Sequence, residues 1–378
     1  MKKHFSPWWK IALPILSLLA VFGLPFSLFL VHPVQPDEPT IFVVPEGASF
    51  STVARQLESH GIVSSSFNMK LLARLRRDTL RVQAGEYNFA APSRPGRVLD
   101  RLVAGDMYRL RLTIPEGMTL QQIGQRLKHL GYKDYEGFLQ AARTEETVKE
   151  LGIEAGNLEG YLFPETYAFG PNLSSRHLIR FMVAELNRRL TPEIEAQAAE
   201  LGLSRHELIT LASIIQKEAG SEKEMPLISA VFHNRLRKGM RLQADPTVIY
   251  GLENFRGNLT RSHLRQPTPY NTYTNFGLPP GPIANPGSAA LHAAANPAEV
   301  NYLYFVARGD GLHQFSRTLR EHNQAVQRYL RNLRQRNTKP ADQATEPDEL
   351  EASSTAKPAG PEPQAVLAAH NSAAIISD

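Results

Sequence analysis

A strand, a tight turn and an amphipathic helix follow one another twice in this 378-residue chain. The first copy begins at Val44-Pro45-Glu46-Gly47, and the second begins 70 residues later at Ile114-Pro115-Glu116-Gly117. Proline ends a strand because it has no N–H to donate, and glycine readily adopts the positive φ of a tight turn. The repeat therefore predicts two strand–turn–helix units, with Glu46 and Glu116 as turn residues near a helix N-terminus rather than catalysts.

An uncharged apolar run extends from Ile11 to Val31, after three lysines and before two acidic residues. A helix of this length rises far enough to cross a hydrocarbon core of about 30 Å. The run is longer than the apolar part of a usual signal peptide, and no small-x-small cleavage site follows it. It predicts a transmembrane helix over 11–31. The lysines favour a cytoplasmic tail over 1–10 and a periplasmic location for the rest of the chain.

A small module is expected over 41–110, after a proline-rich linker at 32–40. Its predicted elements are a strand, two helices and a strand, at residues 41–44, from about 51, about 67–76 and 85–89. This β-α-α-β order resembles a LysM domain, a small sugar-binding module, and a generic α+β spacer accounts for it equally well. The second strand–turn–helix unit then occupies 111–156 and leads into a catalytic part.

The segment 157–335 predicts a mixed α/β catalytic domain, so the fold class expected for the whole chain is α+β. Helical patterns cover about 175–190, 192–201, 204–219, 225–237 and 318–334. Two short apolar runs on either side of Arg308-Gly309-Asp310-Gly311 predict a β-hairpin. Residues 336–378 are rich in proline, alanine, serine and glutamate, and we expect them to be disordered.

Several classes of chemistry have no support in the sequence. The chain has no cysteine, which excludes disulfides and thiol catalysis. His206-Glu207 begins an H-E-x-x-H pattern, but Thr210 stands where the second histidine ligand would be. We find no glycine-rich phosphate loop, nucleophile elbow or nucleic-acid-binding motif. The sequence therefore predicts no metal, no cofactor and no nucleic-acid partner, although the net charge is +5.

The most informative helix is expected between Ser204 and Gly220. Ser204 and Glu207 form a capping box, and Gly220 fits a C-cap. The buried stripe of this helix is expected to consist of Leu208, Leu211, Ala212 and Ile215. Glu218 falls on or beside the stripe, where lost hydration and the negative end of the helix dipole both raise a carboxyl pKa. A general acid at neutral pH needs such a pKa, although a purely structural glutamate is the commoner case.

From Leu158 to about Tyr329 the sequence resembles the endolytic murein transglycosylases. The matching blocks are Leu158–Tyr167, Ser213–Glu218, Val231–Leu236, Gly239–Gly251, Tyr270–Tyr273, Gly277–Gly287 and Tyr302–Val306. The predicted anchor and LysM-like module also match this family's layout, so the resemblance covers nearly the whole chain except its tail. The family's catalytic glutamate falls on Glu218. Gln216 stands where many relatives carry a carboxylate, which argues that a carboxylate is not essential at that position.

The resemblance implies cleavage of the β-1,4 bond between N-acetylmuramic acid and N-acetylglucosamine without water. One carboxylate protonates the leaving oxygen and then accepts the C6 hydroxyl proton while a 1,6-anhydro ring closes. No second carboxylate is obligatory, whereas glycoside hydrolases use two. The family role implied is termination of nascent glycan strands by an inner-membrane enzyme associated with peptidoglycan synthases. A hydrolytic muramidase and a non-catalytic peptidoglycan-binding scaffold are the alternatives.

Supporting residues are harder to assign from sequence. Six polar or aromatic residues in loop-like segments are candidates for substrate binding, namely Tyr161, Asp245, Tyr250, Asn271, Tyr273 and Asn285. A structural role is the alternative for each, and Asp245 before Pro246 also fits a turn cap. Glu159 and Glu165 are the other candidates for a second carboxylate. Product length, oligomeric state and preference for nascent or mature wall are not encoded in any motif.

Overall fold

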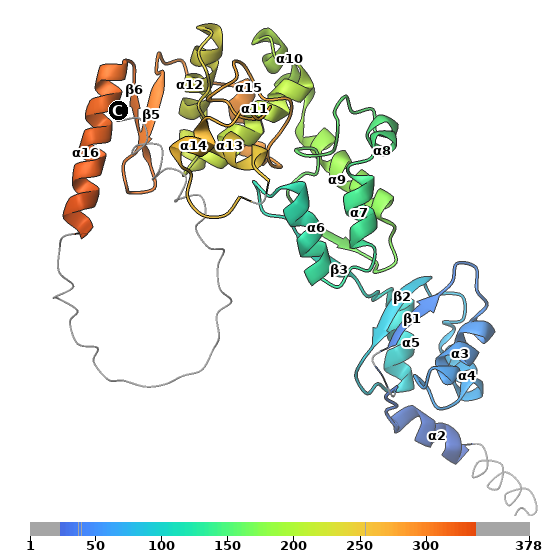
Figure 1. Ribbon diagram of the computed structural model, residues 1–378. Helices are drawn as coiled ribbons and strands as arrows, with labels where there is room; N and C mark the ends of the chain where they lie inside the picture. Colours follow the sequence, from blue (N-terminus) through green and yellow to red (C-terminus); the bar gives the residue numbers. More distant parts are fainter. Residues whose placement is uncertain (1–22, 37, 39, 254, 338–378) are drawn as a thin grey trace, which may run out of the picture. The chain divides into compact units, whose positions relative to one another are not determined.

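The structure is a computed structural model that describes residues 23–36, 38, 40–253 and 255–337. Within these residues the chain forms two compact units (Figure 1). The first extends to Arg111 and includes Tyr167–Leu173, and the second contains Leu112–Thr166 and continues from Ser174. Strand β3, Leu110–Thr113, pairs with β4, Thr166–Phe169, in the segments where the chain passes from one unit to the other.

The prediction of a transmembrane helix over 11–31 is wrong for the part of the chain that the structure describes. None of the helices described there is long and apolar enough to cross a membrane. The described part of the apolar run forms α2, Leu24–Val31, whose eight residues rise only about 12 Å. Phe29 of α2 is buried in the core of the first unit. Residues 11–22 lie outside the described residues. The predicted single-pass inner-membrane localisation rested on this helix and is corrected with it.

The first unit has the predicted β-α-α-β order. Strand β1, Thr40–Val44, pairs antiparallel with β2, Gly85–Phe89. Between them lie α3, Phe50–Ser59, and α4, Ser66–Arg76, and α5, Pro95–Ala104, follows. Side chains alternate along β1, so that Phe42 and Val44 are buried while Ile41 and Val43 are exposed. The buried face and the three helices enclose one apolar core.

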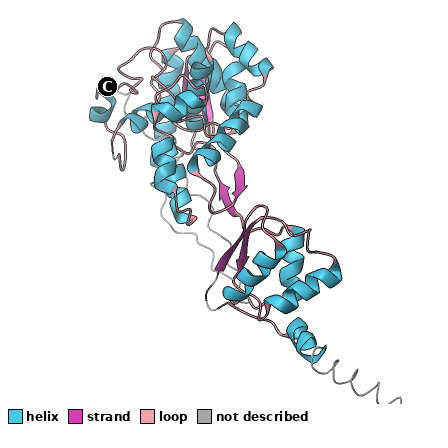
Figure 2. Cartoon of the chain, turned by 90° about the vertical axis from the view of Figure 1, so that its right-hand side faces the viewer, coloured by secondary structure: helices cyan, strands magenta, loops and turns pink. Residues whose placement is uncertain are grey.

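The second unit is mostly helical (Figure 2). Its helices are α6 Leu120–His129, α7 Tyr135–Ala141, α8 Glu145–Glu150, α9 Ser175–Arg189, α10 Pro192–Glu200, α11 Arg205–Glu218, α12 Met225–Arg237, α13 Asp245–Gly251, α14 Arg261–Leu264, α15 Ser288–Ala295 and α16 Leu319–Asn337, with a short 3-10 turn at Glu222–Glu224. Every residue from Leu208 to Ile215 of α11 is buried, and α10, α12, α13 and α15 contact this helix. Helix α11 is therefore the central element of the unit rather than an amphipathic surface helix.

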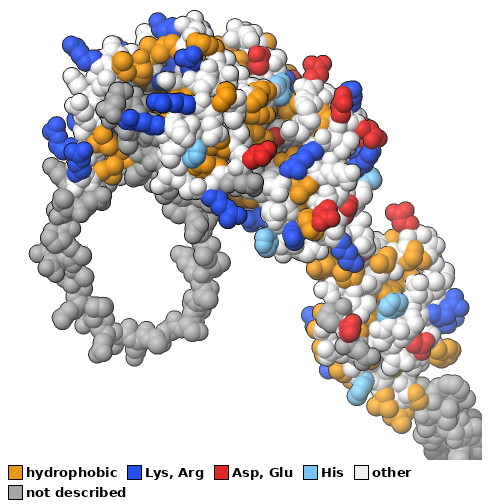
Figure 3. Space-filling view, in the orientation of Figure 1, with side chains coloured by type: hydrophobic (Ala, Val, Ile, Leu, Met, Phe, Trp, Pro, Cys, Tyr) orange, Lys and Arg blue, Asp and Glu red, His pale blue; other side chains and the backbone are white. Residues whose placement is uncertain are grey.

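The C-terminal part of the second unit is a hairpin covered by a helix. Strand β5, Tyr304–Ala307, pairs antiparallel with β6, His313–Ser316, as the sequence predicted. Helix α16 packs Ala325, Val326 and Tyr329 into a small core with β5. Its opposite side carries exposed arginines, and Lys and Arg side chains gather over this helix in Figure 3.

Local signals set the ends of the key helices correctly, with one exception. Ser204 and Glu207 form the predicted capping box at the start of α11. The prediction that Gly220 is the C-cap is wrong, because α11 ends at Glu218 and the cap residue is Ala219, whose backbone is extended. Gly220 instead lies against the hairpin, where a Cβ would be 2.0 Å from the Gly311 carbonyl oxygen. Close backbone approach, and not a positive φ, accounts for this glycine.

Candidate active site

Glu218 is the last residue of α11, at the point where the central helix reaches an accessible surface. Its side chain is neither fully buried nor fully exposed. Burial, reinforced by repulsion from the Asp245 carboxylate, raises the pKa of Glu218 to about 8, while Arg235 acts in the opposite direction. A carboxyl group with this pKa is mostly protonated at neutral pH and can donate a proton.

Two charged residues next to Glu218 are held firmly in place. Asp245 begins α13, is 2% exposed and accepts a hydrogen bond of 2.6 Å from the Tyr273 hydroxyl. Arg235 lies on α12, and its guanidinium donates to the carbonyl oxygens of Leu303 and Leu242 at 2.7 and 2.6 Å. Fixed charges cost no reorganisation when charge develops on a substrate. The site thus combines one protonated acid, one buried carboxylate and one buried guanidinium.

A second buried carboxylate, Glu159, lies in the loop between α8 and β4 and contacts the N-terminus of α6. It is 5% exposed and accepts hydrogen bonds from the Leu120 amide at 2.9 and 3.1 Å, the Tyr250 hydroxyl at 3.2 Å and the Asn285 side-chain amide at 3.3 Å. Burial raises the pKa of Glu159 to about 7 despite these donors. Because Glu159 accepts hydrogen bonds from three internal donors, it links α6 to α13 and to the loop that contains Asn285.

The second Pro-Glu-Gly turn packs against the end of α11. The Gly117 amide donates to the Asn285 carbonyl oxygen at 2.8 Å, and the Lys217 ammonium donates to the Gly117 carbonyl oxygen at 3.4 Å. Glu116 lies beside Gln216, and desolvation there raises the pKa of the Glu116 carboxyl. Gly117 has the positive φ predicted for the turn. The turn therefore brings a third carboxyl group to the same end of the helix as Glu218.

The six predicted substrate-binding residues separate into three pairs. Asp245 and Tyr273 lie near Glu218, and Tyr250 and Asn285 contact Glu159.

Tyr161 and Asn271 are buried among internal partners. The Tyr161 hydroxyl bonds to His206 Nδ1 at 2.8 Å, and burial raises the pKa of Tyr161 to about 12. The Asn271 amide donates to the carbonyl oxygens of Leu264 and Gln266. Their hydrogen bonds stabilise the loops in which these two residues lie.

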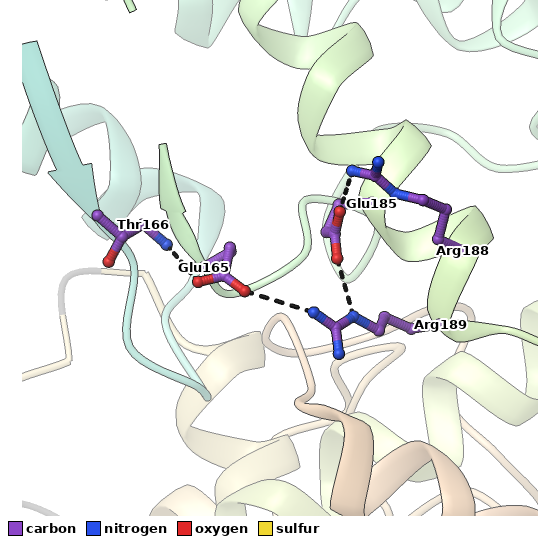
Figure 4. Close-up of polar contacts among 5 residues, drawn as sticks. All are labelled: Glu165, Thr166, Glu185, Arg188 and Arg189. Carbon is purple, nitrogen blue, oxygen red and sulfur yellow. Dashed lines mark hydrogen bonds and ion pairs between the residues drawn. The ribbon is translucent and has the colours of Figure 1, made fainter. Parts of the chain in front are cut away.

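Glu165, the other candidate for a second carboxylate, belongs to a surface network of charges (Figure 4). Its carboxylate accepts from the Thr166 amide at 2.9 Å and pairs with Arg189 at 3.4 Å. Arg189 also pairs with Glu185 at 2.8 Å, and Arg188 contacts the same carboxylate. Glu165 is therefore part of an exposed network of ion pairs on the surface.

Arg235 had no role predicted from the sequence, although it lies in Val231–Leu236, one of the blocks that resemble the transglycosylase family. The signal in the sequence was a basic residue among the apolar positions of a predicted helix. A charge that is buried in this way must be compensated by pairing or hydrogen bonding. The positions of Asp245 and Glu159 relative to Glu218 carried no comparable signal, because 27 and 59 residues separate them along the chain.

Comparison with known proteins identifies the family. Residues 42–328 match the YceG-like family. A protein of Bacillus subtilis (strain 168) named endolytic murein transglycosylase is 32% identical over 319 residues, which cover 80% of this chain and 88% of that protein. A protein of the same name from Streptococcus pneumoniae (serotype 2, strain D39) is 29% identical, and the match covers 81% of this chain but only 61% of that protein.

A solved structure supports the same assignment. The crystal structure of a YceG-like protein from Listeria monocytogenes matches with a TM-score of 0.53 and 32% sequence identity, covering 76% of this chain and 98% of that one. The family match extends over far more than half of the sequence and includes both units. By sequence and by structure, this chain belongs to the YceG-like family.

Proposed function

We propose that this chain is an endolytic lytic transglycosylase that cleaves peptidoglycan glycan strands, with Glu218 as its proton-transferring residue. The observation that carries the proposal is the environment of Glu218, an accessible carboxyl group whose pKa is raised to about 8. Two relatives of the chain bear the name endolytic murein transglycosylase. A protonated acid at the end of a helix is what the first step of that reaction requires.

The geometry supports both halves of the reaction. Glu218 first donates its proton to the glycosidic oxygen between N-acetylmuramic acid and N-acetylglucosamine, and the C–O bond breaks. The buried Asp245 carboxylate, which accepts a hydrogen bond from Tyr273 and interacts with Glu218, would stabilise the positive charge that develops on the muramyl ring. Glu218 is then an anion beside a second anion, so it is a strong base for the C6 hydroxyl proton. Attack of that oxygen on the anomeric carbon closes the 1,6-anhydro ring.

A hydrolytic muramidase is the competing enzyme, and the nearness of Asp245 to Glu218 is the observation in its favour. Hydrolysis needs the second carboxylate as a nucleophile or as a base for water. Asp245 is almost fully buried and already accepts a hydrogen bond from Tyr273, which suits charge stabilisation better than activation of water. A binding scaffold without catalysis is the remaining alternative.

Mass spectrometry of digested glycan strands distinguishes the three functions. Anhydro ends indicate a transglycosylase, reducing ends indicate a hydrolase, and intact strands indicate a binding protein. We expect the Glu218→Gln variant to fold and to bind glycan while releasing no anhydro product, whereas Glu200→Gln, at an exposed carboxylate of α10, behaves like the wild type. Normal turnover by Glu218→Gln would disprove the assignment of this residue.

The proposal also includes glycan binding by the first unit and a role at nascent glycan strands. The β-α-α-β order of the first unit supports a LysM-like module that holds glycan. Cleavage within nascent strands, termination of their elongation and association with peptidoglycan synthases follow from the family resemblance. Co-purification of the full chain with purified synthases, and the length of strands made in its presence, test these points.

A further inference from the structure

A cavity of about 280 Å³ lies in the second unit beside the first turn of α6. Gln121 and its neighbours in α6 form one wall, and Tyr250 of α13 forms another. Glu159, Asn157 and Arg143 complete the lining. The cavity is open to solvent, and six of its seven lining residues carry polar side chains, although apolar atoms make up most of its wall. It can therefore admit a ligand that has both polar and apolar parts.

The acceptor groups of this cavity are already used by the protein. Both oxygens of Glu159 accept hydrogen bonds from Leu120, Tyr250 and Asn285. The side-chain oxygen of Asn157 accepts from the Glu159 amide at 2.8 Å. A ligand that depends on donating hydrogen bonds would therefore find these oxygens occupied.

Hydrogen-bond donors, in contrast, lie at the rim. Arg143 is exposed, and one nitrogen of its guanidinium donates to the Gln121 side-chain oxygen at 2.7 Å. That bond orients the guanidinium, which has five N–H donors in total. A planar guanidinium held in this way recognises carboxylates through paired hydrogen bonds.

Helix α13 places the cavity close to the proposed catalytic carboxyl group. Asp245 at the start of this helix lies beside Glu218, and Tyr250 in the same helix lines the cavity. Tyr250 lies five positions after Asp245, which corresponds to a rise of about 7.5 Å along the helix axis. A glycan strand that is bound at Glu218 and extends along α13 would present its neighbouring substituents to this cavity.

We propose that this cavity binds a carboxylate of the short peptide stem attached to a muramyl residue next to the cleaved bond. The inference rests on the proposed peptidoglycan substrate and deepens it, because it assigns a preference for strands that carry peptides over strands that have lost them. Arg143 is the residue that determines this preference, and Gln121 positions it.

Binding and cleavage test the proposal separately. The first measurement uses the Glu218→Gln chain and compares its affinity for a soluble disaccharide-tetrapeptide with that for the same disaccharide without the peptide. We expect the peptide to strengthen binding about 10-fold, the scale of one charge-assisted recognition. Arg143→Met in the same background should abolish this difference, whereas Arg126→Met, an exposed arginine of α6 outside the cavity, should keep it.

The second measurement compares cleavage of intact glycan strands and of strands stripped by an amidase. The wild type should prefer intact strands, and Arg143→Met should reduce the ratio of the two rates about 10-fold. Equal binding of the two disaccharides by the parent, or a preference that survives Arg143→Met, would overturn the proposal. Absence of anhydro ends from the wild type on both substrates would refute the transglycosylase function instead, and the binding measurement would still decide the role of Arg143.

Discussion

Replacing the proposed catalytic acid should stabilise the protein at neutral pH while abolishing its activity. The ordinary pKa of a glutamate in the unfolded chain is 4.5, and in the folded protein that of Glu218 is about 8. At pH 7 the unfolded chain releases a proton that the folded protein retains, so ionisation favours unfolding. Glu218→Gln removes this contribution because glutamine is neutral in both states.

The size of the effect follows from the difference in pKa. Each pH unit between 4.5 and 7 lowers the free energy of unfolding of the wild type by about 1.4 kcal/mol. The upper limit of the stabilisation by Glu218→Gln at pH 7 is therefore roughly 3.4 kcal/mol. Because the side chain is partly exposed, we expect a gain of about 2–3 kcal/mol. For a unit of this size, that gain corresponds to a rise in Tm of about 4–12 °C.

The pH dependence has a definite sign. Below pH 4.5 the carboxyl group is protonated in both states, so the substitution changes nothing. Between 4.5 and 8 the gain increases with pH, and above about 8 it stays constant because the folded protein is then ionised as well. The proton-donating form is lost over the same upper range, so wild-type cleavage should decline above about pH 8.

Thermal unfolding of the full chain, followed by circular dichroism at about pH 4, about pH 7 and about pH 9, measures the gain. Glu200→Gln is the matched control and should change Tm little at any pH, because this carboxylate is exposed. A Tm difference between wild type and Glu218→Gln that does not vary with pH, or no difference at all, would refute the argument that Glu218 is held protonated.

Three further predictions follow from the same geometry. Asp245→Asn removes the repulsion that raises the pKa of Glu218, so the alkaline limb of the pH–rate profile should move to lower pH; an unmoved limb would show that Asp245 does not act on this acid. Glu159→Ala leaves three buried donors without an acceptor, and chemical denaturation should show a loss of about 2–4 kcal/mol, whereas an unchanged midpoint would contradict its linking role. Gly220→Ala should displace the hairpin, because its new Cβ would meet the Gly311 carbonyl oxygen, and slower cleavage with a lower Tm is expected; wild-type values for both would argue against this close contact.

Much of the secondary structure could be predicted from the sequence because its signals are local. The capping box at Ser204 and Glu207 marks the start of α11, and the predicted helix at 225–237 coincides with α12. The hairpin around Arg308-Gly309-Asp310-Gly311 formed as expected from turn residues between apolar runs. In each case the deciding interactions join residues only a few positions apart, so the pattern and the structure report the same physics.

The apolar run near the N-terminus shows where local composition misleads. Hydropathy alone predicted a membrane helix over 11–31, yet its described residues form the short helix α2, which contributes Phe29 to the core of the first unit. A protein core and a lipid bilayer both remove an apolar side chain from water, and both are favourable environments for it. Composition therefore does not distinguish the two when a folded partner is available.

The sequence by itself determined that Glu218 would stand at the end of a largely apolar helix and that the pKa of its carboxyl group would be raised. Both predictions depend only on spacing along one helix. Only the tertiary structure decided which charges surround it. Folding brings Asp245 and Arg235 close to this carboxyl group, and it brings the turn at Glu116 to the same end of the helix. Folding also supplies internal hydrogen-bond donors to both oxygens of Glu159. Electrostatic interactions depend on distance in space and on burial, and a linear pattern records neither.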